Sequence, residues 1–445
     1  MTRTDFLMKL FDALEGLPSE VRTEIISEYQ EYFRSEEETG RTEENIIASL
    51  GDPVALAQVI KNRKGFTPQS DPINMRKPRS SRRFVTWVIV AMIMMGVFGG
   101  IGSAIKMVVK GGFDKMLFGV GTQYDVNDVK EVNWDNAKTI EIHTTSTDTT
   151  LFSAQTEKVK AALTGSVKTT NPDAVPTLEI KQSGDTISII EKRKVTSIIG
   201  FYSSNVKLDI SIPESFNGVV AYNGMSGNFT SSNLKLKTLR LDLSSGDVDL
   251  ENISLEEDFF VSSTSGNTEI HGLQAKAATL KATSGDKEFL DFSVSGDIHI
   301  LSHSGNTRIE NLNCKQIILE STSGDIKAEK SKVDLFSVNS SSGNITLKDL
   351  EGAARVKSTS GNIEVLYQLL VGEVNLSATS GNIKLSVPSG SGFDLEARSS
   401  SGNIDCAFDL EHETRSKGKL QGVHGSGEVP VTLAVTSGNI KVMKK

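Results

Sequence analysis

Two histidines and a nearby aspartate are the first residues in this sequence whose types and spacing could bind a metal. His299 and His303 lie four residues apart and follow Asp297, and imidazole and carboxylate groups are ordinary zinc ligands. The chain holds six histidines in all and offers no second cluster that would complete a tetrahedral site. We therefore interpret His299 and His303 as surface residues and expect no metal.

A repeated Ser-Gly-Asn/Asp tripeptide places carboxylates at regular intervals. A stacked row of such carboxylates could bind calcium, and within 221–445 the tripeptides that end in Asp do so at Asp247, Asp286, Asp297 and Asp325. Asn takes the same position in the other eight tripeptides. Because amides weaken such a row as a set of ligands, we favour a structural role for the tripeptide in a turn.

The repeated serines could supply a nucleophile, but the sequence lacks the surroundings that a nucleophile needs. It contains no Gly-x-Ser-x-Gly element, and no histidine keeps a fixed spacing to these serines. Residues 106–445 contain only six arginines, and Trp134 is the sole tryptophan there. Neither a polysaccharide-cleaving face nor an aromatic platform for sugars is indicated. We expect no catalytic residue, no cofactor and no enzymatic activity.

Charge and cysteine content exclude further classes. The formal net charge of −8 disfavours non-specific binding to nucleic acid. The only cysteines are Cys314 and Cys406. If the tripeptide repeats stack as β-layers, these two lie about five layers or roughly 24 Å apart, which is beyond the reach of a disulfide. We expect two free thiols.

The tripeptide recurs with nearly constant spacing, which is typical of a repeat architecture. Gly296 falls inside one interval and is set aside, and the successive spacings from Gly227 to Gly402 are then 18 to 21 residues. The predicted repeat turns are at Gly227, Gly246, Gly266, Gly285, Gly305, Gly324, Gly343, Gly361, Gly381, Gly402 and Gly438.

Apolar and polar residues alternate on both sides of each tripeptide, as in EVNLSATSGNIKLSV at 373–387. A period of two on both sides of a turn predicts two short strands per repeat, each with one apolar face. Two strands cannot stand alone in water, so consecutive repeats must stack. We predict an all-β parallel β-solenoid over 221–445. The competing fold is an antiparallel sandwich of hairpins, which does not require constant spacing.

The segments beside the repeats are also strand-like. We interpret 138–220 as a β-rich N-terminal cap and 106–137 as a membrane-proximal stalk, because exposed ends of a solenoid invite edge pairing. Residues 409–430 interrupt the period with polar residues and are expected to form a loop.

A single transmembrane helix is predicted at 84–105, a stretch of 22 residues without charge. Five basic residues precede it and three follow, which places the N-terminus in the cytoplasm and the C-terminal domain outside the cell membrane. The basic, proline-containing segment 65–83 is a linker. Small residues one helical turn apart could bring two such helices together in a homodimer, at Gly96, Gly100 and Ala104.

Residues 1–64 predict a small all-α domain. Apolar residues recur at helical spacing, as at Phe6, Leu7, Leu10 and Leu14, and the stretches are bounded by capping residues. Four short helices can form a minimal bundle, although about 60 residues give only a marginal core. Such a domain often depends on a partner.

This segment resembles a known family. The pattern Leu17-Pro18, Glu24-Ile25, Tyr29, Tyr32-Phe33 and Leu50-Gly51-Asp52-Pro53 is similar to the HAAS family of bacterial N-terminal helical signalling modules, which are associated with PadR-like transcription regulators. The resemblance covers about the first 60 residues. It implies a PadR-like regulator or another cytoplasmic protein as the partner at 1–64.

The repeat region resembles a second family, the adhesin-type, toastrack-like β-solenoids that stand outside membrane anchors in bacterial envelope-stress systems. This resemblance rests on the Ser-Gly-Asn/Asp-Ile repeat and spans roughly 138–445. It implies the fold and leaves the ligand open, which could be an envelope component or a protein.

Together these features predict a single-pass signalling or envelope-stress protein with an external binding domain and an internal regulator-contacting module. One alternative is a surface adhesin without a signalling role. Another is an envelope enzyme that acts on polysaccharide, which the residues favour least. Nucleic acid is not an expected partner.

Overall fold

The computed structural model describes residues 121–134, 136–194 and 201–445, together with some residues of the N-terminal segment: Phe6, Leu7, Lys9, Leu10, Ala13, Leu14, Tyr29, Phe33, Glu43 and Pro53. The chain divides into two compact units, Met1–Phe113 and Asp114–Lys445. Each unit is described by itself.

In the first unit, the described residues agree with the expected helical pattern. Phe6, Leu7 and Leu10 are buried and helical, and Leu14 is buried at the end of that turn, where its N–H donates to the Leu10 carbonyl. The Phe6 and Phe33 rings meet edge to face, with centroids 5.8 Å apart. These contacts are what an apolar stripe at helical spacing produces.

The predicted transmembrane helix at 84–105 lies outside the described residues, as do Gly96, Gly100 and Ala104, the linker 65–83 and the stalk up to residue 120. Among the residues that are described, no helix combines the length and the apolar character that crossing a bilayer requires. The transmembrane assignment stays a prediction.

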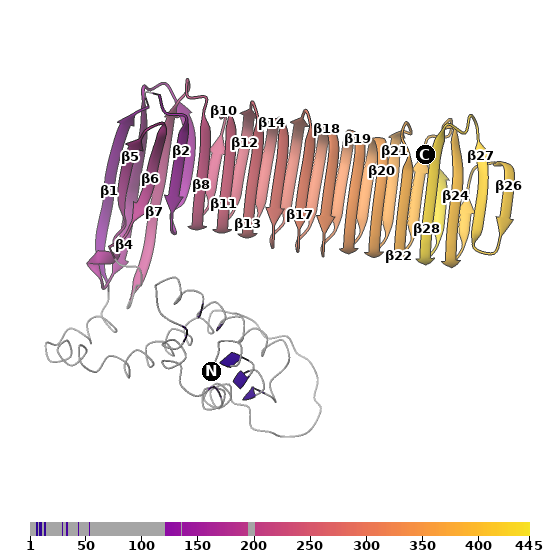
Figure 1. The fold of residues 1–445 in the computed structure, drawn as a ribbon, viewed down its shortest axis with the longest axis horizontal. Coiled ribbons are helices and arrows are strands. Elements are labelled where there is room, and N and C mark those ends of the chain that lie inside the picture. Colours follow the sequence, from indigo (N-terminus) through magenta and orange to yellow (C-terminus); the bar gives the residue numbers. More distant parts are fainter. Residues whose placement is uncertain are drawn as a thin grey trace. The chain divides into compact units, whose positions relative to one another are not determined.

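The second unit is all-β (Figure 1). Its elements are β1 (Thr122–Asn133), β2 (Thr139–Thr144), β3 (Asp148–Ala154), β4 (Lys158–Thr169), the 3-10 turn η1 (Pro172–Ala174), β5 (Thr177–Ser183), β6 (Thr186–Lys192), β7 (Tyr202–Pro213), β8 (Val219–Ser226), β9 (Phe229–Ser232), β10 (Lys235–Leu236), β11 (Thr238–Ser245), β12 (Val248–Leu255), β13 (Asp258–Ser265), β14 (Thr268–Ala275), β15 (Ala277–Ala282), β16 (Lys287–Val294), β17 (Asp297–Ser302), β18 (Thr307–Ser321), β19 (Ile326–Ser342), β20 (Ile345–Ser360), β21 (Ile363–Leu369), β22 (Val374–Ser380), β23 (Ile383–Val387), β24 (Phe393–Ser401), β25 (Ile404–Cys406), β26 (Glu411–Ser416), β27 (Lys419–His424), β28 (Val429–Ser437) and β29 (Ile440–Lys444).

The repeats stack as parallel coils. The strands before the tripeptides pair in parallel in the order β8, β11, β13, β15 and β17, continuing through the second halves of β18, β19 and β20 to β22. The strands after the tripeptides form a second parallel ladder from β9 through β12, β14 and β16 to β23. This confirms a solenoid-like fold, and the pairing contradicts a sandwich of independent hairpins.

The core lies between the two ladders. Along each strand, buried apolar residues alternate with exposed or half-buried polar ones, so that layers of Leu, Ile, Val and Phe stack on one another. Phe259, Phe289 and Phe336 are at most 1% exposed. Alternation places one apolar row of each strand inside, and stacking continues that row from coil to coil.

The coils turn at two rows of positive φ, of which the first continues to Gly438 and the second ends at Asp349. The first corner is the Ser-Gly-Asn/Asp tripeptide, whose glycines have φ between 91° and 147°. The second corner lies within or after the following strand, where φ lies between 51° and 75°, at Asn233, Asn252, Gly272, Asp291, Asn311, Lys330 and Asp349. The residue type at the second corner is not constant, so no repeated motif in the sequence marks it.

The N-terminal end begins with a coil that lacks the tripeptide. β2 pairs in parallel with β8, and β3 pairs with β9, so residues 139–154 form the first coil inside the segment interpreted as a cap. β6 then adds to β2 and β7 adds to β3, and the long strands β4 and β1 follow in antiparallel pairing.

The C-terminal end departs from the order of the sequence. β28 lies between β22 and β24 (Figure 1). Its partner strand β29 lies between β23 and β25. The last repeat is therefore inserted between two earlier ones. The expectation of a loop at 409–430 was wrong, because β26 and β27 form an antiparallel hairpin that pairs with β24. Polar composition does not distinguish a loop from a hairpin at the edge of a sheet, because the strands of an edge hairpin can also be polar.

Candidate functional site

The repeated glycines occupy positions where a side chain cannot fit. A Cβ added at Gly324 would lie 2.2 Å from the backbone oxygen of Gly305 in the preceding coil, and one at Gly343 would lie 2.2 Å from that of Gly324. The same contact of about 2 Å recurs at the first corner from Gly246 to Gly438. These glycines therefore set the distance of closest approach between coils.

The residue after each glycine forms a continuous hydrogen-bond ladder. The side-chain oxygen of one Asn or Asp accepts the backbone N–H of its counterpart in the next coil, as Asn267 Oδ1 accepts from Asp286 at 2.9 Å and Asp286 Oδ1 from Asn306 at 2.7 Å. In spatial order the ladder runs Asp148, Asn228, Asp247, Asn267, Asp286, Asn306, Asp325, Asn344, Asn362, Asn382, Asn439 and Asn403.

Carboxylates and amides alternate in the first part of this ladder, so no two carboxylates are adjacent. Two carboxylates separated by an amide lie about 9.6 Å apart, which is too far for both to coordinate one calcium ion at about 2.4 Å. The described residues contain no group of three His, Cys, Asp or Glu side chains that could hold a metal. Asp297 lies outside the ladder, at the start of β17.

The two candidate histidines lie on the outer face of the fold. His299 and His303 are both exposed, on the same side of the chain at β17 and just after it. Four residues along an extended strand span about 13 Å, so the two imidazoles cannot share one ion. Although His299 and His303 lie on the same face of the chain, they therefore do not form a metal site.

Both cysteines are free thiols. Cys314 is 7% exposed, and burial raises the pKa of its thiol to about 12. Cys406 is half-buried, and burial also raises its pKa. Neither is poised as a nucleophile, because the thiolate is the reactive form.

One lysine that was not singled out from the sequence is buried beside the first corner. Lys287 is 3% exposed and pairs with Thr268 and Thr307 in the flanking coils. Its ammonium donates to the Ser302 hydroxyl and to the Ser304 carbonyl, the latter at 2.8 Å. Burial lowers the pKa of Lys287 to about 8.

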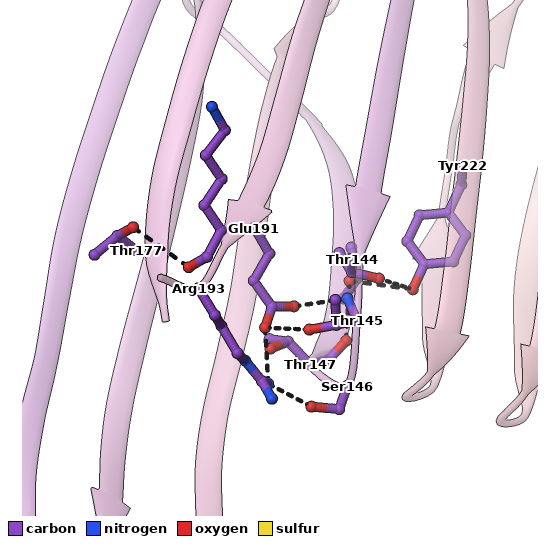
Figure 2. Close-up of polar contacts among 10 residues, drawn as sticks. Thr144, Thr145, Ser146, Thr147, Thr177, Glu191, Arg193 and Tyr222 are labelled. Carbon is purple, nitrogen blue, oxygen red and sulfur yellow. Dashed lines mark hydrogen bonds and ion pairs between the residues drawn. The ribbon is translucent and has the colours of Figure 1, made fainter. Parts of the chain in front are cut away.

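A cluster of polar side chains holds the cap to the first coil (Figure 2). The Glu191 side chain at the end of β6 is fully buried and accepts the Thr145 N–H at 2.9 Å and the Thr145 hydroxyl at 2.6 Å. Arg193 pairs with Glu191 at 3.0 Å and donates to the Ser146 hydroxyl at 2.6 Å. Its guanidinium lies 5.1 Å from the centre of the Tyr202 ring.

This cluster replaces a missing corner. Thr145-Ser146-Thr147-Asp148 occupies the place of a tripeptide, and Asp148 starts the ladder by accepting the Asn228 N–H. Nearby, the buried Tyr222 hydroxyl lies 2.8 Å from the Thr144 hydroxyl. The signal available in the sequence was a charged Glu-Lys-Arg run directly after an apolar strand, which is unusual for a surface turn.

A groove of about 540 Å³ runs over the outer face beside this cluster. One line of residues crosses four parallel strands at its base, with His143 beside Asn223, Asn223 beside Asp242, and Asp242 beside Ser262. Met225, also in the groove, is 63% exposed. Asp242 has no hydrogen bond or ion pair to any described residue, so the groove presents a free carboxylate among hydroxyls and an amide.

Comparison with known proteins identifies two family matches. The HAAS family model matches residues 5–59. The Toastrack DUF4097 family model matches residues 137–302 and 291–443, which together span more than half of the chain. A comparison with curated proteins gives no match.

Two solved structures are similar to the chain at low sequence identity. A proposed cell adhesion protein from Clostridium sporogenes ATCC 15579 is 10% identical, with 72% of this chain and 100% of that chain covered and a TM-score of 0.17. A proposed adhesin from Bacteroides fragilis NCTC 9343 is 12% identical, with 72% and 97% covered and a TM-score of 0.25. On the family match over its larger part, the chain belongs to the Toastrack DUF4097 family.

Proposed function

We propose that this chain is a single-pass signalling protein of the bacterial cell envelope, in which an external β-solenoid binds an envelope component or protein and an internal helical module contacts a PadR-like regulator. The observation that carries the proposal is the order of three segments. The HAAS match at 5–59 and the toastrack match at 137–443 lie on opposite sides of the uncharged stretch 84–105.

The orientation follows from charge. Five basic residues before 84–105 and three after it favour a cytoplasmic N-terminus. The small helical domain would then meet a cytoplasmic partner, and the solenoid would meet envelope ligands. A single helix transmits a signal through a change in oligomeric state or spacing, which contact at Gly96, Gly100 and Ala104 could support.

The proposed ligand contact is the groove beside the Glu191 cluster. Its free carboxylate, Asp242, and its hydroxyls at Ser244 and Ser262 suit a polar ligand that carries hydroxyl or ammonium donors. The proposal includes no catalytic step. In support, the buried Glu191 carboxylate already accepts bonds from Thr145 and Arg193, which leaves it poorly suited as a general base.

The test compares two variants with the full chain in its own cells. Deletion of 1–64 should change expression of the regulated genes while surface binding is retained. Substitution Asp242→Asn should weaken ligand binding while protein abundance in the membrane is retained. Unchanged expression after the deletion, together with surface binding in the full chain, would contradict signalling and favour the passive adhesin.

A further inference from the structure

The last repeat of the chain fills a one-coil slot between two earlier repeats. Residues 429–444 lie between the coil 374–387 and the coil 393–406, with parallel pairing on both sides in both ladders. The corner ladder follows the same spatial order, because Asn382 accepts from Asn439 and Asn439 accepts from Asn403. The hydrogen-bond ladder at the first corner thus passes without a break through a segment that is inserted out of sequence order.

This order sets a constraint on folding. The coil 393–406 and the hairpin that follows precede 429–444 in the chain, but they cannot reach their final positions until 429–444 is in the slot. Before that, both flanking coils carry unpaired edges with free backbone N–H and C=O groups. Such an edge pairs with any strand of suitable register.

The slot is not specific for the segment of its own chain. The inserted sequence VTLAVTSGNIKV at 431–442 closely resembles VNLSATSGNIKL at 374–385, and both supply the same corner and the same apolar row. What favours the chain's own segment is its tether. Gly425–Glu428 crosses the end of β24 in four residues, from His424 on one side of Phe393 to Val429 on the other.

The loop that makes this crossing is short, although its five Cα–Cα steps, up to about 17 Å when extended, are enough to cover it. His424 and Val429 both pair with Phe393 from opposite sides, so the tether covers two strand spacings, or about 9.6 Å. It does so with positive φ at Gly425 and Gly427. Short hinge loops of this kind favour exchange of the following element between two copies of a protein.

We propose that residues 429–444 form an exchangeable coil and that a second copy of this chain can supply it, giving a reciprocal dimer joined at the C-terminal ends of two solenoids. The partner surface is the slot between β22 and β24 on one face and between β23 and β25 on the other. Outside the hinge 425–428, the dimer keeps the hydrogen bonds of the single chain and changes only which chain provides the inserted coil.

The test uses two full-length chains with different tags, co-expressed in the membrane, each with Cys406→Ser. One carries Ser377→Cys and the other Ala434→Cys. These positions are direct neighbours in the parallel pairing of β22 with β28, about 4.8 Å apart and within disulfide reach. Exchange predicts a disulfide-linked product that contains both tags.

The matched control places the cysteines in two coils that are consecutive in sequence. Ser337→Cys on one chain and Arg355→Cys on the other are neighbours of the same kind in β19 and β20, and this pair should give several-fold less product. A single chain with both Ser377→Cys and Ala434→Cys should close its own disulfide, which reports that the coil is inserted.

A second variant changes only the tether. A flexible insertion of Gly and Ser between Gly427 and Glu428 lets the segment fold back into the slot of its own chain more easily and should lower the two-tag product several-fold. The proposal is overturned if the single chain closes its own disulfide but the mixed chains give no more product than the control. It is also overturned if the lengthened tether leaves the amount of two-tag product unchanged.

Discussion

At the first corner of every coil from Gly227 onward the chain has glycine, whereas the second corner accepts Asn, Asp, Lys and Gly. Both corners have positive φ, so backbone conformation alone does not separate them. The φ angles of 91° to 147° at the first corner are almost restricted to glycine, while those near 55° at the second corner lie in the left-handed region that Asn and Asp enter readily.

Packing between coils adds to this difference. At Gly324 an added Cβ would meet the backbone oxygen of Gly305 at 2.2 Å. This oxygen cannot rotate away, because it belongs to the main chain of the preceding coil. At Gly272 it would meet the side-chain oxygen of Asn252 at 3.0 Å, which can rotate. In this stacked array, a corner that always has glycine is one where the backbones of neighbouring coils approach closely. A corner with a variable residue type requires only a left-handed backbone conformation.

The largest expected effect is substitution at the first corner. Gly324→Ala should lower the free energy of unfolding by about 3 kcal/mol or more, because of strain in φ and a clash with Gly305. Chemical denaturation of the purified chain measures this. Gly272→Ala is the matched control and should cost only about 1 kcal/mol. Equal losses at the two sites would remove the distinction between the corners.

The second effect concerns the buried amine at the first corner. Lys287→Ile should stabilise the fold at pH 7 by up to about 3 kcal/mol, since the native chain buries an ammonium that forms no ion pair with a carboxylate of the described residues. Ile occupies the corresponding position in later coils, at Ile326 and Ile345. Thermal unfolding compares the two chains.

The sign of its pH dependence follows from the lowered pKa. Below pH 8 the folded and unfolded states both hold the proton, so the cost of burial is fully present. Between pH 8 and 10.5 Lys287 is deprotonated in the folded state but still protonated in the unfolded state. Its contribution to the free energy of unfolding should therefore rise with pH. The advantage of Lys287→Ile should shrink over that range, and a constant advantage would contradict the assignment.

A smaller effect tests the alternation of amides and carboxylates in the ladder. Asn306→Asp would place three carboxylates in adjacent coils, with Asp286 and Asp325, and should cost roughly 0.5–1 kcal/mol at low salt. Asn382→Asp lies between two amides and should have less effect. The difference should vanish at high salt, and its persistence there would exclude charge as the cause.

The smallest effect is expected at the second corner. Lys330→Gly removes the strain of a left-handed lysine but also removes its exposed ion pair with Glu310 and gives the unfolded chain more freedom. These contributions oppose one another, so the free energy of unfolding should change by less than about 0.5 kcal/mol. A loss as large as that of Gly324→Ala would show that this corner is not permissive.

The stacking could be predicted from the sequence because its signal is repeated many times. Each tripeptide adds one more instance of the same turn, and the alternation around Gly381 is enough to define two strands. The first coil could not be found in this way. Thr145-Ser146-Thr147-Asp148 has no glycine, because Glu191 and Arg193 take the place of a preceding corner.

The position of the last repeat could not be predicted either. Its own residues are nearly those of the repeat at 374–387, so local sequence does not say which neighbours it has. The groove was missed for a related reason, since His143 and Asp242 come together only through parallel pairing of distant strands. The loops that connect the repeats determine their order in space, and the sequences of these loops carry only a weak signal of that order.

The central claim is that the coils stack along one axis in the order described, and distances between spin labels test it most directly. With one label at Ser244→Cys, a second at Thr436→Cys should lie about 38 Å away and one at Ser400→Cys about 43 Å away, for eight and nine layers of about 4.8 Å. The account predicts that residue 436 is nearer than residue 400. The opposite order, or distances that do not grow with the number of layers, would contradict it.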